Sequence, residues 1–147
     1  MENQFFKYWF SGFEKGLMQA DPNSRMSILK ECAKACSESY TKQIYQEEYS
    51  KSEDLNDFLK RLNNRFSEMR IDVIQENQAF LFTYTYCACD LVKEGYISCG
   101  QLCECSRFSL QENWESVLGK GRVQVQLLES ILRGGDCCKL LVEVDAI

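Results

Sequence analysis

The stretch Ala79-Phe80-Leu81-Phe82-Thr83-Tyr84-Thr85-Tyr86 decides the fold class, because its side chains alternate in character. Every second side chain of an extended chain lies on the same face, so the alternation predicts a strand. One face of this strand is aromatic and consists of Phe80, Phe82, Tyr84 and Tyr86. Residues 70–74 alternate as well, and Gln75-Glu76-Asn77-Gln78 predicts the turn that joins the two strands.

Two more strands are predicted later in the sequence. Residues 123–127 alternate, and residues 138–144 do so again, with Cys138 on the apolar side. Between them, Arg133-Gly134-Gly135-Asp136 predicts a hairpin turn. A helix that Ser106 caps and Gly119 stops is predicted ahead of this strand pair.

The first part of the sequence has helical spacing instead. Phe6, Phe10, Phe13 and Leu17 recur on one face of a helix, and further helices are predicted over 24–49 and 52–65. The sequence therefore predicts an α+β fold: N-terminal helices, then an antiparallel sheet with one inserted helix and a C-terminal β-hairpin. A length of 147 residues predicts a single domain over 1–147, since one domain takes roughly 100–200 residues.

Composition excludes several functions and suggests a compartment. The net charge of −5 argues against a nucleic-acid partner. The chain has no histidine, so Ser-His or Cys-His catalysis and histidine metal ligands are excluded. The sequence shows neither a signal peptide nor 18 consecutive apolar residues, so no membrane partner and a cytoplasmic location are expected.

Nine cysteines are the most unusual feature of the chain, and a reducing compartment would keep them free. Close cysteine pairs are typical of thiolate metal sites, in which four sulfurs surround one zinc ion. The predicted metal ligands are Cys87, Cys89, Cys103 and Cys105, with Cys32 and Cys36 as a competing or additional pair. Zinc is the expected cofactor, while iron or an iron–sulfur cluster would use the same ligands. A thiol redox pair and plain core packing are the alternatives, and packing is favoured for Cys32, Cys36 and Cys138.

From Cys87 to Val144 the sequence resembles an uncharacterised, cysteine-rich bacterial family. This family is related to L-2-amino-thiazoline-4-carboxylic acid hydrolase-like proteins and, remotely, to the 4-vinyl reductase domain. The resemblance lies in Cys87-Ala-Cys89-Asp-Leu-Val-Lys-Glu-Gly95, Leu102-Cys103-Glu104-Cys105-Ser106, Leu127-Leu-Glu-Ser130-Ile131 and Gly134-Gly135-Asp136-x-Cys138. It departs at Arg107-Phe108-Ser109, where the family pattern would have Gly-Trp. The vinyl reductase resemblance implies an α+β module that binds a small apolar or aromatic ligand, often as a dimer.

Three functions follow as hypotheses. The first is a sensor-like domain that binds a metal and a small-molecule ligand; the aromatic strand face and Trp114 are then either pocket walls or ordinary core. The alternative is a hydrolase that opens a small sulfur–nitrogen heterocycle such as 2-amino-thiazoline-4-carboxylate, as the resemblance implies, with catalytic residues unknown. As an interaction protein, the chain would use its aromatic first helix to form a homodimer, unless that helix packs into the core.

Overall fold

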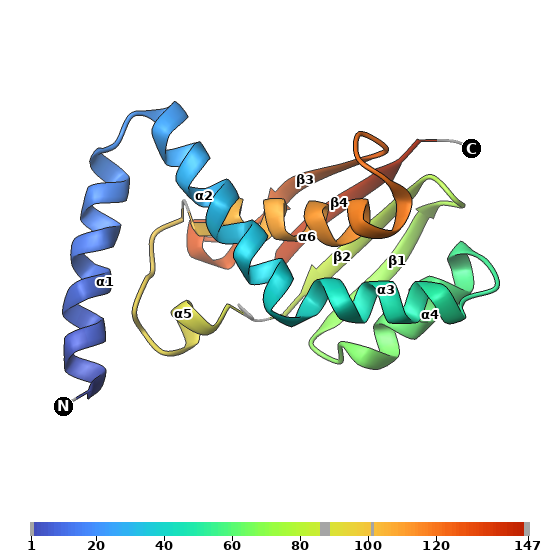
Figure 1. The fold of residues 1–147 in the computed structure, drawn as a ribbon, viewed down its shortest axis with the longest axis horizontal. Helices are drawn as coiled ribbons and strands as arrows, with labels where there is room; N and C mark the ends of the chain where they lie inside the picture. Colours follow the sequence, from blue (N-terminus) through green and yellow to red (C-terminus); the bar gives the residue numbers. More distant parts are fainter. Residues whose placement is uncertain (1, 86–88, 101, 146–147) are drawn as a thin grey trace.

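The computed structural model describes residues 2–85, 89–100 and 102–145 of the chain. Its four strands form one antiparallel sheet in the order β1-β2-β4-β3, and helices cover one face (Figure 1). The strands are β1 (Met69–Gln75), β2 (Ala79–Tyr84), β3 (Val123–Glu129) and β4 (Cys138–Val144). The predicted α+β class is confirmed, although Tyr86 of the predicted aromatic face lies outside the described residues.

The two predicted hairpins differ in how they are closed. Between β1 and β2, the Gln78 N–H donates to the Gln75 carbonyl at 3.0 Å, as expected for a tight turn. Between β3 and β4 the predicted tight turn is wrong. A short 3-10 helix, η2 (Ile131–Arg133), comes first, and Gly134 follows with a left-handed φ of 92°. The connection is longer than a tight turn because it contains η2. It is closed by a hydrogen bond from the Gly135 N–H to the Ser130 carbonyl at 2.8 Å.

The helices before the sheet begin where the sequence offers caps. Asp21 accepts a hydrogen bond from the Ser24 N–H at 3.0 Å, and Asp54 accepts one from the Asp57 N–H at 2.8 Å. The helix predicted over 24–49 is real but contains a five-residue π turn, η1. The elements are α1 (Glu2–Gln19), α2 (Pro22–Cys36), η1 (Ser37–Thr41), α3 (Lys42–Lys51) and α4 (Leu55–Arg65).

Two helices lie between β2 and β3, where one was predicted. The four-residue α5 (Asp90–Lys93) was not predicted. The larger helix, α6 (Leu102–Leu118), begins at Leu102 rather than at Ser106. The prediction was wrong at this boundary because it relied on Ser106 as a cap. The observed start places two cysteines, Cys103 and Cys105, on a helix instead of in a loop.

The core lies between α6 and the sheet and is centred on Trp114. This side chain is fully buried, stacks on Phe80 at a centroid distance of 5.8 Å and meets Phe58 edge-on at 5.4 Å. Phe82 and Tyr45 complete the surrounding aromatic shell. Phe80, Phe82 and Trp114 are therefore core residues rather than pocket walls, and Tyr84 packs against this core.

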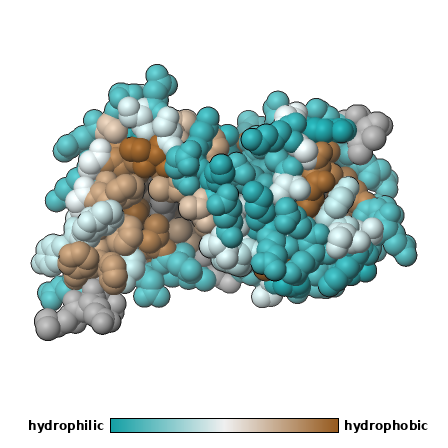
Figure 2. All heavy atoms as spheres, in the orientation of Figure 1, coloured by the Kyte–Doolittle hydropathy of each residue, from teal (hydrophilic) through white to brown (hydrophobic). Residues whose placement is uncertain are grey.

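Helix α1 lies apart from the helical layer and exposes apolar side chains (Figures 1 and 2). Trp9 is 55% exposed and Phe5 is 65% exposed, while Leu17 is buried, alone among residues 4–19 of this helix. Its aromatic contact with the rest of the molecule is with Tyr96, against which Phe6 and Phe10 pack. Among the described residues, no helix is long and apolar enough to cross a membrane.

Candidate functional site

The cysteines of α2 lie on one side of that helix. Cys32 and Cys36 are four residues apart, so both sulfurs point the same way, and both side chains are exposed. Burial of the sulfur nevertheless raises the pKa of the Cys36 thiol, a hydrogen bond with Ser109 lowers it, and negative charges at Cys89 and Asp90 raise it again. Cys36 therefore lies within electrostatic reach of the segment that precedes α5.

The cysteines at the start of α6 point to different surroundings. Successive α-helical residues are rotated by about 100°, so Cys103 and Cys105 lie on opposite sides of the helix. Cys103 is buried, and its Sγ lies 2.7 Å from the Ser130 Oγ, at the end of β3. The two residues were predicted to act as one close pair of metal ligands. Their helical conformation separates them.

Cys105 belongs with the cysteines of α2. Burial, together with negative charges at Cys36, Cys32 and Cys89, raises the pKa of the Cys105 thiol to about 12. Cys36 and Cys105 thus lie within electrostatic reach of other cysteines, which come from α2, the segment before α5, and α6. We call Cys32, Cys36, Cys89 and Cys105 the thiol cluster.

The other predicted and candidate cysteines lie elsewhere or outside the described residues. Cys87, a predicted metal ligand, is outside them. In the ranges that the structure describes, no three or more Cys, Asp or Glu side chains are arranged to hold a metal ion. On the strand pair, the Cys137 thiol donates to Glu129 Oε2 at 3.0 Å, while the Cys138 Sγ accepts from the Ile131 N–H at 3.4 Å. The thiol cluster is therefore the place where predicted ligands come together.

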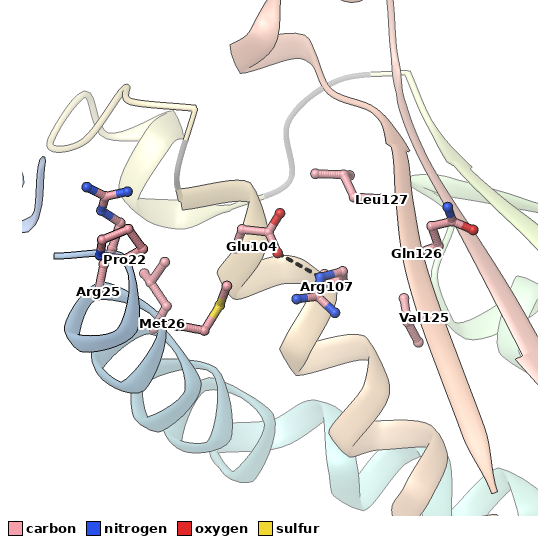
Figure 3. A pocket seen from close by; sticks show the side chains of 9 residues that line it. Pro22, Arg25, Met26, Glu104, Arg107, Val125, Gln126 and Leu127 are labelled. Atoms are coloured by element: carbon pink, nitrogen blue, oxygen red, sulfur yellow. Dashed lines mark hydrogen bonds and ion pairs between the residues drawn. The ribbon is translucent and has the colours of Figure 1, made fainter. Parts of the chain in front are cut away.

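A groove of about 520 Å³ lies between β3 and the helices α2 and α6 (Figure 3), and these two helices also carry cysteines of the cluster. This volume is within the range of small-molecule sites, about 300–1,000 Å³. Apolar side chains from α2 and β3 line it, including Met26, Leu29 and Leu127. Arg107 and Glu104 of α6 lie across it and form an ion pair at 2.7 Å.

Sequence reasoning missed this groove as a site. In the sequence, Glu104 is an acidic residue between two cysteines, and Arg107 marks a departure from a family pattern. An acid and a base three residues apart are a usable signal when the helix is placed correctly, because they then share a face. Nothing in the sequence around Arg25, which also lines the groove, indicates a site.

Comparisons with known proteins yield a fold but no family. No family model matches the chain, and no curated protein matches it. A solved structure of trafficking protein particle complex subunit 3 from Naegleria fowleri, covalently bound to palmitic acid, is similar with a TM-score of 0.57. The match covers 99% of this chain and 96% of that chain at 9% sequence identity. The chain therefore shares the fold of this trafficking subunit.

Proposed function

We propose that this chain is a cysteine-rich domain that binds one metal ion at the thiol cluster and a small molecule in the adjoining groove. The observation that carries the proposal is the electrostatic influence of cysteines from three segments on Cys36 and Cys105. The four side chains would have to move closer together around the ion, because their described arrangement does not hold one. Zinc is the expected metal, because four cysteine sulfurs are a common structural zinc set. A cytoplasmic location belongs to the same proposal, since free cysteines persist in a reducing compartment.

The electrostatics of the cluster support a cation. Burial and the negative charges of neighbouring cysteines raise the pKa of the Cys36 and Cys105 thiols, which favours their protonated form in the metal-free protein. A bound divalent ion would reverse this effect by stabilising the thiolate form of every ligand. The ion would tie α2, the segment before α5, and α6 to one another. Metal binding would then contribute directly to the folding free energy.

The small-ligand half of the proposal rests on the groove. Its volume suits a small molecule, and its walls join apolar side chains to an ion pair. The trafficking subunit of similar fold is covalently bound to palmitic acid, so an apolar ligand is compatible with this architecture. The hydrolase alternative stays a prediction, because no contact between described residues tests it.

Metal content is the first experiment. Protein purified anaerobically, without a metal-affinity step, is analysed by mass spectrometry for metal and by titration for free thiols. We expect about one zinc per chain, as for a structural site. The double variant Cys36→Ser/Cys105→Ser should lose it, whereas Cys137→Ser, on the strand pair, should retain it.

Two outcomes would contradict the metal proposal. Metal-free protein with nine titratable thiols would leave the cluster as packed, protonated cysteines. Metal-free protein with missing thiols would indicate a redox pair instead, and peptide mapping would identify the bonded cysteines.

A further inference from the structure

The charges at the groove are unbalanced. Glu104 accepts from the Arg107 Nε at 2.7 Å and from an Arg133 Nη2 at 3.3 Å, so one carboxylate faces two guanidinium groups. The chain as a whole carries a net charge of −5, so this local positive excess runs against the average. An anion near these residues would balance the excess charge.

Arg107 is the guanidinium best placed to meet that anion. The Arg107 Nε donates to Glu104. Among the described residues, no group accepts a hydrogen bond from the two terminal nitrogens of Arg107. The group lies over the Phe108 ring, 4.2 Å from the centroid, which restricts its orientation. Arg25 differs, because its Nε and Nη2 already donate to the carbonyls of Leu17, Met18 and Ala20 at the end of α1.

The opposite walls of the groove are aliphatic. Leu29 and Val125 are buried at its floor, and Met26 is 36% exposed at its side. Leu127 points into the groove from β3, towards the Glu104–Arg107 pair (Figure 3). A ligand that fills the groove therefore meets aliphatic side chains along one part and a guanidinium group at another.

We propose that the groove binds an amphipathic carboxylic acid, with its aliphatic chain on Met26, Leu29 and Leu127 and its carboxylate on Arg107. The guanidinium groups at the groove outnumber the Glu104 carboxylate, which favours an anionic ligand, and the planar edge of a guanidinium matches the two oxygens of a carboxylate. This inference rests on the small-ligand half of the proposed function and names the class of ligand.

Calorimetric titration of the full chain with octanoate, 1-octanol and acetate tests the inference. Octanoate has both parts of the ligand, 1-octanol lacks the charge, and acetate lacks the chain. We expect octanoate to bind at least about tenfold more tightly than either, as one charge-assisted pair allows. Arg107→Gln should remove that advantage by weakening octanoate alone, while Arg70→Gln, in an exposed ion pair on β1, should change nothing.

A second variant keeps the test independent of the α6 ion pair. Met26→Glu adds a negative charge at an exposed wall position and should weaken octanoate by about tenfold through repulsion and lost apolar contact. Equal binding of octanoate and 1-octanol, or unchanged octanoate binding in both variants, would overturn the carboxylate inference and leave a ligand site standing. Absence of binding by both octanoate and 1-octanol would overturn the small-ligand proposal as well, and the metal count would be unaffected.

Discussion

At the residue scale, the helical layer is joined by a small polar network inside the apolar core. The Ser37 hydroxyl donates to the Asn113 side-chain oxygen, which also accepts from Thr41 Oγ1 at 3.1 Å. Ser37 and Asn113 are both buried, so neither group can turn to water for a replacement. The network ties the π turn η1 to the middle of α6, and the register between these helices depends on it.

Asn113→Ala should lower the free energy of unfolding by about 1–3 kcal/mol, the usual cost of leaving a buried hydroxyl without its acceptor. Urea denaturation measures the change. In the Asn113→Ala background, a further Ser37→Ala substitution should cost far less, because the orphaned hydroxyl is gone. A loss below about 0.5 kcal/mol for Asn113→Ala would show that the network is not a stabilising contact.

Glu129 controls the reactivity of Cys137. The hydrogen bond to Glu129 and the charge of its carboxylate raise the pKa of the Cys137 thiol, and burial adds to the effect. Glu129→Gln removes the negative charge, so the thiol should ionise at lower pH. We expect faster alkylation of Cys137 by iodoacetamide at pH 8 in this variant, measured peptide by peptide by mass spectrometry. An unchanged rate at Cys137 would contradict the assignment, and Glu143→Gln, on the neighbouring strand β4, serves as the control.

At the element scale, α1 is the helix with the weakest attachment. Phe10 stacks on Tyr96 at 5.4 Å, and the Ser98 N–H donates to Glu14 at 3.2 Å. At the end of the helix, Arg25 holds the last carbonyls. An 18-residue helix with so few contacts gains little stability from the core, and short helices are marginal in isolation. Homodimer formation through its exposed aromatic face stays a prediction.

Tyr96→Ala should loosen α1 without unfolding the sheet, because Phe6 and Phe10 lose the ring on which they pack. Hydrogen–deuterium exchange should therefore speed up at the amides of residues 5–16, while β2 and β4 stay protected. Tyr8→Ala, which removes a side chain that is 72% exposed, is the matched control. Equal protection of α1 in all three proteins would show that Tyr96 does not anchor it.

At the scale of the whole molecule, the sequence predicted the helices and strands better than it predicted which of them are in contact. The alternation of side-chain character in β2 and β4 indicated which side chains face the core, because one face of each strand is buried there. The pairing of β2 with β4 joins Tyr84 to Cys138 across α5, α6, β3 and η2, and no local pattern encodes this. The fold class was therefore predictable, and the order of the strands was not.

The same limit applies to the candidate site. Spacing identified Cys32 and Cys36 as one face of a helix, which holds in the structure. Cys103 and Cys105 were grouped by spacing alone, yet the earlier start of α6 sends them to opposite sides. Cys105 meets the α2 cysteines only because α2 packs on α6, a tertiary contact. Arg107 lines the groove for the same reason, because the groove forms where α2 and α6 pack together.

The central position of β4 has a consequence for how this chain folds during its synthesis. β4 is the last of the four strands to be synthesised, yet it pairs with both β2 and β3. Until it emerges, β1 and β2 form an isolated hairpin, and β3 has no neighbouring strand. An isolated hairpin is at best marginally stable in water, so Phe80 and Phe82 stay accessible to chaperones until β4 emerges. The complete sheet therefore forms only after β4 has been synthesised.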